Sequence, residues 1–94
     1  MINPFIIMRE VEKYFCLPKG AICSDKRSRT WVEARNVAVY LCQKHTRFSS
    51  TELGEIFERD HTFALEAVKR IKKQEDLHNI YTKIDTILLQ KYGN

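Results

Sequence analysis

Four consecutive residues near the middle of the chain, Arg59, Asp60, His61 and Thr62, all have side chains that can form hydrogen bonds. A carboxylate can accept a hydrogen bond from cytosine N4, a histidine can donate to a base acceptor, and a threonine can contact the thymine methyl group. Arg59 is placed to reach a phosphate or a base. We expect all four to contact the major groove, because side chains at the start of a recognition helix reach base edges. Asp60 can also serve as a helix cap, and one carboxylate oxygen is enough for that role.

A cluster of basic residues lies closer to the N-terminus, in the segment SDKRSRT at positions 24–30. This segment is polar and lacks apolar periodicity, so we expect an exposed loop. A narrow A/T-rich minor groove attracts arginine, and Lys26, Arg27 and Arg29 are the candidates to enter it. Asp25 dilutes the positive charge, and an ordinary polar loop is the alternative interpretation.

Contacts to the phosphate backbone form the third requirement for DNA binding. Arg35 and Asn36 fall in the first two turns of a helix predicted to start at Trp31. A helix N-terminus with free N–H groups beside a guanidinium is a natural site for an anion. We also assign Ser50 and Lys69 to phosphate contacts. Solvated side chains on helix surfaces are the alternative for this group.

These residues need a pair of short helices to hold them, and positions 49–73 provide the pattern. Ser49 and Glu52 form a predicted capping box at the start of the first helix. Asp60 can cap a second helix that starts at His61, and the turn between the two helices is very short. This layout is that of a helix-turn-helix. The second helix has an apolar inner face and a polar outer face, formed by Ala64, Ala67, Val68 and Ile71 and by Thr62, Glu66, Lys69 and Lys73 respectively.

Helical spacing of apolar residues also appears on both sides of this pair. It predicts helices over 4–16, from Trp31 to about Thr46, and over a closing segment that includes Leu77 to Leu88. Thr30 and Glu33 predict a second capping box, and the polar stretch 74–79 predicts a bend. With no strand pattern, the sequence predicts an all-α fold of five or six helices around one core. A chain of 94 residues is expected to form one domain, residues 1–94.

Two segments of the sequence resemble one known family. The residues LGEIFERDHTF at 53–63 are similar to the signature I-G-x-x-F-G-G-R-D-H-T-T-V of the DNA-binding C-terminal domain of the bacterial replication initiator DnaA. The residues SDKRSRTWVEARN at 24–36 resemble that family's basic loop and the helix after it. The resemblance extends over about residues 6 to 90. It implies a helix-turn-helix domain that binds an A/T-rich box in double-stranded DNA.

The resemblance also implies roles for individual residues. Arg35 and Asn36 stand where the family has an arginine and a glutamine that hold the DNA backbone. Arg27 aligns with the family's minor-groove arginine. The family counterparts of Asp60, His61 and Thr62 read bases; we assign these residues the same role.

Three departures from the family pattern have consequences. The family has two glycines before R-D-H, whereas this chain has only Glu58, so we expect a tighter turn without glycine's freedom to take a positive φ. Phe63 replaces a threonine. Glu58 and Glu66 bring negative charge to the expected DNA face, which weakens phosphate attraction. These departures favour the main alternative, a protein-interaction module that kept the fold and lost its DNA contacts; binding to structured RNA is a third hypothesis.

The composition of the chain restricts its possible partners, location and activity. The net charge of +4 and the pI of about 9.1 make a polyanionic partner plausible. Three cysteines without paired spacing favour a reducing, cytoplasmic location, and we expect no membrane span. Because no Walker A motif is present, we expect no nucleotide, no cofactor and no ATPase module. We also expect no enzyme, since no nucleophile–base pair emerges. A free-standing domain is the first hypothesis, although an excised piece of a longer protein would give the same sequence.

A metal-ligand spacing occurs once, in Cys42-x-x-His45, with Cys23 as a third candidate ligand. A buried thiol and a histidine at a helix end explain the same residues more simply. We therefore assign no metal site.

Overall fold

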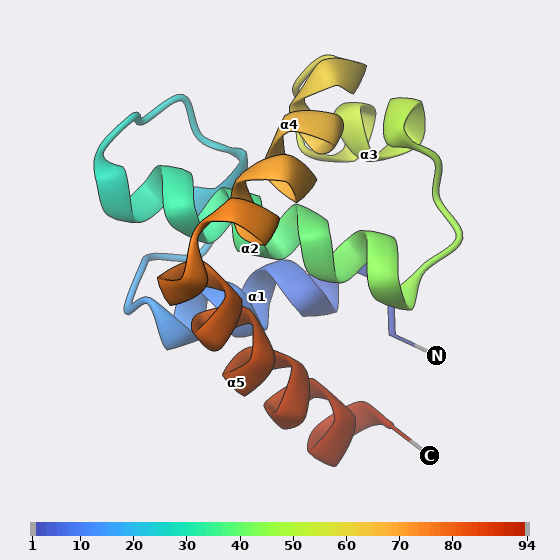
Figure 1. Cartoon of the computed structure of the whole chain (residues 1–94). Coiled ribbons are helices and arrows are strands. Elements are labelled where there is room, and N and C mark those ends of the chain that lie inside the picture. Colours follow the sequence, from blue (N-terminus) through green and yellow to red (C-terminus); the bar gives the residue numbers. More distant parts are fainter. Residues whose placement is uncertain (1, 94) are drawn as a thin grey trace.

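The computed structural model describes residues 2–93, and all regular secondary structure among these residues is helical. Figure 1 shows their arrangement. The predicted all-α fold is confirmed, with five α-helices. Their bounds are α1 Pro4–Tyr14, α2 Arg29–His45, α3 Ser50–Ile56, α4 His61–Lys73 and α5 Glu75–Tyr92, with a short 3-10 helix, η1, at Ala21–Cys23.

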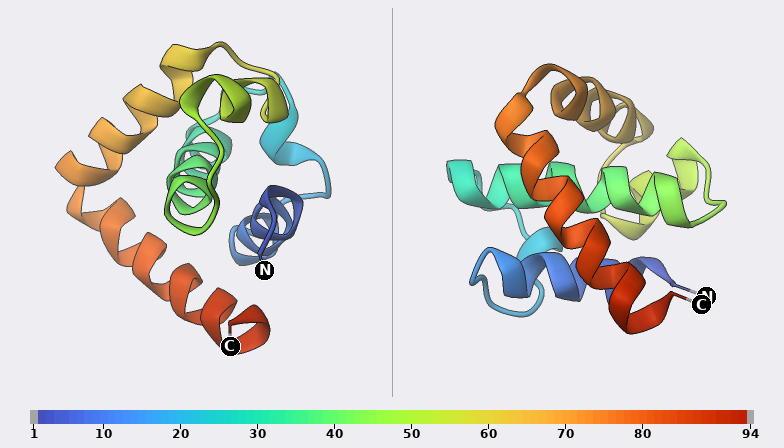
Figure 2. Two further views of the ribbon diagram at one scale, coloured as in Figure 1. Left: turned by 90° about the vertical axis from the view of Figure 1, so that its right-hand side faces the viewer. Right: turned by 60° about the horizontal axis from the view of Figure 1, so that its bottom comes forward.

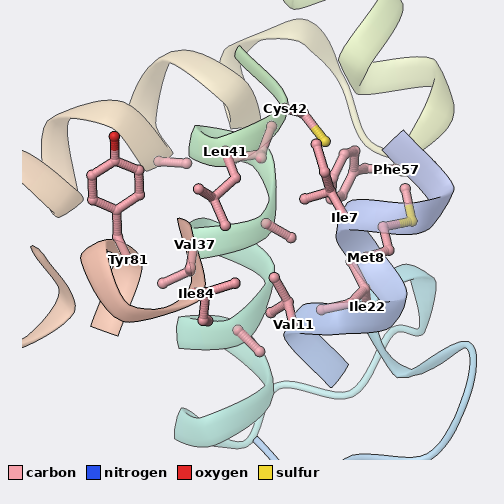
Figure 3. Close-up of a cluster of buried hydrophobic side chains, with 14 of the residues drawn as sticks. Ile7, Met8, Val11, Ile22, Val37, Leu41, Cys42, Phe57, Tyr81 and Ile84 are labelled. Atoms are coloured by element: carbon pink, nitrogen blue, oxygen red, sulfur yellow. The ribbon is translucent and has the colours of Figure 1, made fainter. Parts of the chain in front are cut away.

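Helix α2 is the centre of the fold, and every other helix packs against it. Figure 2 shows α2 surrounded by the remaining helices, with the two ends of the chain on the same side. The reason lies in its sequence, because positions 34–42 place fully buried apolar side chains on several sides of the helix. Each fully buried valine or leucine among them stabilises the fold by about 1.5–3 kcal/mol relative to an exposed position. In Figure 3, Val37 and Leu41 lie between Ile84 of α5 and Ile7 of α1.

The two capping boxes predicted from the sequence have different outcomes. Ser49 and Glu52 form theirs at the start of α3, as described below. The box of Thr30 and Glu33 is wrong, since α2 begins at Arg29, with Ser28 at its N-cap and no side-chain cap. Glu33 instead accepts a hydrogen bond from Nε of Arg29 at 2.8 Å. An ion pair between residues i and i+4 on the helix surface has replaced the cap.

The expected bend between α4 and α5 is confined to one residue. Gln74 has an extended conformation, with φ −104° and ψ 105°, and α5 begins at the next residue. The N–H of Gln74 still donates to the carbonyl of Arg70, and its own carbonyl accepts from the N–H of His78. One extended residue is therefore enough to redirect the chain while both helix ends stay hydrogen-bonded. The bend predicted within residues 74–79 is therefore present at the first residue of that stretch. Helix α1 ends at Tyr14, two residues before the predicted end.

Polar contacts fix α5 to the end of α2. Asp85, only 8% exposed, accepts hydrogen bonds from Nζ of Lys44 at 2.7 Å and from the ring of His45. Burial alone would raise the pKa of Asp85, but these two partners outweigh it and lower the pKa. The ring of Tyr81 packs edge-on against Tyr40, with ring centroids 4.6 Å apart.

No helix among residues 2–93 combines the length and apolar character needed to cross a membrane.

Candidate nucleic-acid interface

The first helix of the helix-turn-helix, α3, starts as the sequence predicts. The N–H of Glu52 donates to Oγ of Ser49 at 3.1 Å, and the N–H of Ser49 donates to Oε1 of Glu52 at 3.0 Å. Leu53 and Phe57 are fully buried, which anchors one face of this short helix in the core. Such anchoring matters because a helix of seven residues has little stability of its own.

The turn after α3 corrects the expectation that positive φ is lost with the family's glycines. Glu58 itself takes the left-handed conformation, with φ 58°. The chain then folds back sharply, and the N–H of Arg59 donates to the carbonyl of Gly54 at 2.7 Å. Gly54 permits this approach, because a Cβ atom there would lie 2.8 Å from the carbonyl oxygens of Arg59 and Asp60. The tight turn therefore depends on one strained residue and one missing side chain.

Asp60 caps α4, and it uses a single oxygen to do so. Oδ1 accepts hydrogen bonds from the N–H groups of Thr62 and Phe63 at 3.0 and 3.3 Å and from the hydroxyl of Thr62 at 2.5 Å. The hydrogen bond from the Thr62 hydroxyl is the main cause of a lowered pKa for Asp60. The other oxygen, Oδ2, has no hydrogen bond to any residue in the described part of the chain. The cap thus leaves one acceptor of Asp60 exposed beside His61 and Thr62, which are exposed as well.

Arg35 has a different environment from the exposed helix position that we expected. It is 5% exposed, and its guanidinium donates to three backbone carbonyls, those of Ile22, Ser24 and Lys26, at 2.9, 2.8 and 3.1 Å. Burial lowers the pKa of Arg35, and the nearby charge of Arg59 adds to this shift. Arg35 therefore holds the backbone of the basic loop, and a direct contact with phosphate stays a prediction.

Arg59 supports the same loop with a further hydrogen bond. Its Nη2 donates to the carbonyl of Ser24 at 2.6 Å, and its Nη1 donates to the carbonyl of Glu58 at 3.2 Å. The carbonyl of Ser24 is thus shared by two guanidiniums from distant parts of the sequence. This link connects the loop before α2 to the turn before α4, and part of the guanidinium predicted to reach DNA is already engaged.

The basic loop is exposed, as predicted, but it is shorter than predicted. Lys26 and Arg27 lie in it, and Nζ of Lys26 lies 4.6 Å from the ring centroid of Trp31. Arg29 was expected in the loop and is instead the first residue of α2, where it pairs with Glu33. Arg27 is therefore the arginine that the loop itself presents to solvent.

A hollow of about 720 Å³ lies between this loop, the start of α2 and α4. In Figure 1 the loop and the α3–α4 pair both lie above α2. The hollow brings together four guanidiniums and two carboxylates, so its net charge is positive. Its lining residues are Asp25, Arg27, Val32, Arg35, Asn36, Arg59, Phe63, Glu66 and Arg70.

Several predicted site residues meet in this hollow, and others do not. Asn36 lines it, is 6% exposed and has no side-chain hydrogen bond to the described residues. Ser50, half-buried at the start of α3, and Lys69, exposed on α4, are not among the lining residues. Arg70 was missed by the sequence analysis. The spacing of the two residues could have indicated it, because Arg70 follows Phe63 by seven residues, about two helical turns, and so lies on the same side of α4.

The residues with metal-ligand spacing have other roles in the described chain. Cys42 is fully buried, and burial raises the pKa of its thiol to about 12. His45 binds Asp85. Among residues 2–93, no three side chains of the metal-binding types come together as a site.

Comparison with known proteins identifies the family. Residues 5–71 match the family described as the bacterial dnaA protein helix-turn-helix. The chain is 40% identical over 85 residues to the chromosomal replication initiator protein DnaA of Bacteroides fragilis, covering 81% of this chain and 18% of that protein. It is 30% identical over 88 residues to the chromosomal replication initiator protein DnaA 1 of Chlamydia pneumoniae, covering 92% of this chain and 19% of that protein.

A third relative is the chromosomal replication initiator protein DnaA of Citrifermentans bemidjiense, 37% identical over 70 residues, which covers 73% of this chain and 15% of that protein. The chain thus spans less than a fifth of the length of these relatives. Because the family match covers more than half of the chain and the helix-turn-helix is present in the structure, this chain belongs to the DNA-binding helix-turn-helix family of bacterial DnaA proteins.

Proposed function

We propose that this domain binds double-stranded DNA sequence-specifically, with α4 in the major groove and the loop before α2 in the adjacent minor groove. The supporting observation is the hollow between these two elements. Four guanidiniums, those of Arg27, Arg35, Arg59 and Arg70, line it. A DNA strand that separates the two grooves would cross this hollow, and its phosphates are the ligands that clustered arginines prefer.

Within this proposal the predicted site residues divide into three groups according to the part of the DNA that they contact. His61, Thr62 and the free oxygen of Asp60 read base edges at the start of α4. Arg27 enters the minor groove, where an A/T-rich sequence gives the most negative potential. Asn36 contacts phosphate together with Ser50 and Lys69.

We further propose that residues 1–94 act as a single domain that binds DNA without the help of an ATPase module. The function is binding rather than catalysis, and it takes place in the cytoplasm at boxes of a replication origin or a promoter. The compact helical core described above supports independent folding, because it joins both ends of the chain to α2.

The deciding experiment is selection of bound duplexes from a random pool by the purified 94-residue chain, followed by affinity measurements at several salt concentrations. We expect an enriched A/T-rich site and an affinity that falls steeply as salt rises. Arg27→Ala should reduce the salt dependence, because one phosphate-proximal charge is lost. His61→Ala should relax base preference more than it lowers nonspecific affinity.

Arg47→Ala serves as the matched control, since Arg47 is exposed and does not line the hollow. Equal affinity for all duplexes in the wild-type protein would refute base reading. Absence of duplex binding, together with a protein or a folded RNA as the bound partner, would favour the alternatives of an interaction module or an RNA-binding domain.

A further inference from the structure

Glu66 is an acidic residue in a surface otherwise dominated by arginine. It lies on α4, its side chain is exposed, and it lines the same hollow as Arg27, Arg35, Arg59 and Arg70. Within the described residues its carboxylate forms no ion pair with any of these arginines at 4 Å or less. Both carboxylate oxygens are therefore available as acceptors.

The position of Glu66 on the helix places it on the face that would enter the groove. The buried residues of α4 are Ala64, Ala67 and Ile71. Glu66 follows Thr62 by one helical turn and lies with it on the opposite face. Four residues correspond to about 6 Å along a helix axis, which is close to two base-pair steps of about 3.4 Å each.

The chemistry of a carboxylate restricts which base can face it. An ionised glutamate only accepts hydrogen bonds. In the major groove cytosine presents the N4 donor alone, adenine presents a donor beside the N7 acceptor, and guanine and thymine present acceptors. A carboxylate is attracted to the first, matches the second only in part, and is repelled by the last two.

We propose that Glu66 is a specificity-determining residue that selects cytosine about two base pairs away from the position read by Thr62. The inference rests on the proposed insertion of α4 into the major groove. It gives the negative charge of Glu66 a role beyond the weakening of phosphate attraction. The arginines in the hollow keep the net charge positive, so the carboxylate does not abolish the attraction to DNA.

The test repeats the random-pool selection with the wild-type chain, Glu66→Gln and Glu66→Ala. The wild-type pool should contain cytosine at one defined position. Glu66→Gln should shift that position toward adenine, because a glutamine amide can bind adenine N6 and N7 together. Glu66→Ala should lose the preference at that position only, with about 5- to 150-fold lower discrimination between cytosine and guanine there. Glu55→Gln is the control, since Glu55 is an exposed glutamate of α3 outside the hollow.

Two results would overturn the inference, and they can be told apart. If the wild-type chain selects a site but Glu66→Ala keeps every base preference and binds all duplexes more tightly by the same factor, Glu66 is only a charge. In that case the proposed function stands. If the wild-type chain binds no duplex, both the function and the role of Glu66 fail. Circular dichroism of each variant checks folding, which an exposed side chain should not affect.

Discussion

A single methyl group at Gly54 should disturb the contact between α3 and the turn before α4. In Gly54→Ala the new Cβ atom would lie 2.8 Å from the carbonyl oxygens of Arg59 and Asp60 and 2.9 Å from the carbonyl carbon of Asp60. Ordinary contacts of a Cβ atom begin at 3.4 Å, so the turn would have to move by about 0.6 Å (3.4 minus 2.8). All three neighbours are backbone atoms, which cannot rotate away as a side chain can.

Two opposing effects determine the size of the change. Forcing an extra carbon into a closely packed site costs about 2–3 kcal/mol when the neighbours are rigid. Alanine is a better helix former than glycine by about 1 kcal/mol, which offsets part of this cost. The free energy of unfolding should therefore fall by about 1–2 kcal/mol in total. For a domain of this size such a loss lowers Tm by roughly 5–15 °C.

Urea denaturation followed by circular dichroism measures this difference directly. Glu55→Ala is the matched control, because it changes the neighbouring residue, keeps a good helix former and removes only an exposed side chain. Its stability should stay within about 0.5 kcal/mol of the wild type. If Gly54→Ala were as stable as the control or more stable, the close approach of α3 and the turn would be refuted.

Three further predictions follow from strain, charge and burial. Glu58→Gly should raise the free energy of unfolding by about 0.5–1 kcal/mol, because relief of the strain of a left-handed conformation outweighs the greater conformational freedom that glycine gives the unfolded chain. Urea denaturation measures this difference, and a loss of stability would contradict the φ of 58°. Asp85→Asn should cost about 2 kcal/mol at pH 7, because Lys44 loses its ionised partner. The pKa of Asp85 is lowered in the folded state, so its contribution to stability is fully present above the unfolded pKa and disappears as the pH falls through the folded pKa. The melting temperatures of the wild type and Asp85→Asn should therefore converge as the pH is lowered below about 4. Finally, an aromatic disulfide reagent should label exposed Cys16 quickly in the native protein, and Cys42 only after denaturation; rapid native labelling of Cys42 would contradict its burial.

The sequence predicted the parts of the fold that depend on local patterns. The side chains of Ser49 and Asp60 cap their helices as expected, because each places an oxygen within hydrogen-bond distance of the free N–H groups in the first turn. The apolar spacing of α4 predicted its buried face for the same reason. Such features depend on neighbours within one helical turn, which a sequence displays directly.

Other features depend on contacts between distant residues and were missed or misjudged. Glu12 of α1 looks like a surface residue, but it is 3% exposed and accepts hydrogen bonds from the N–H groups of Gly20 and Ile22. Arg35 looks like a solvent-exposed cation, yet the three carbonyls that surround it come from a segment 9–13 residues earlier. In the candidate site, the sequence therefore predicted which residues would be involved, but it did not show which of them are exposed and which support the loop.

The carbonyl oxygen of Ser24, held by Arg35 and Arg59 together, has a consequence for how a ligand would be met. The loop carrying Arg27 is already ordered in the free protein, so its conformational entropy is lost during folding rather than at the moment of association. The same hydrogen bonds also fix the separation between that loop and the first turn of α4 before a ligand binds. A partner whose dimensions match this gap is accepted without rearrangement, and one with a wider or narrower spacing must break the shared hydrogen bonds first.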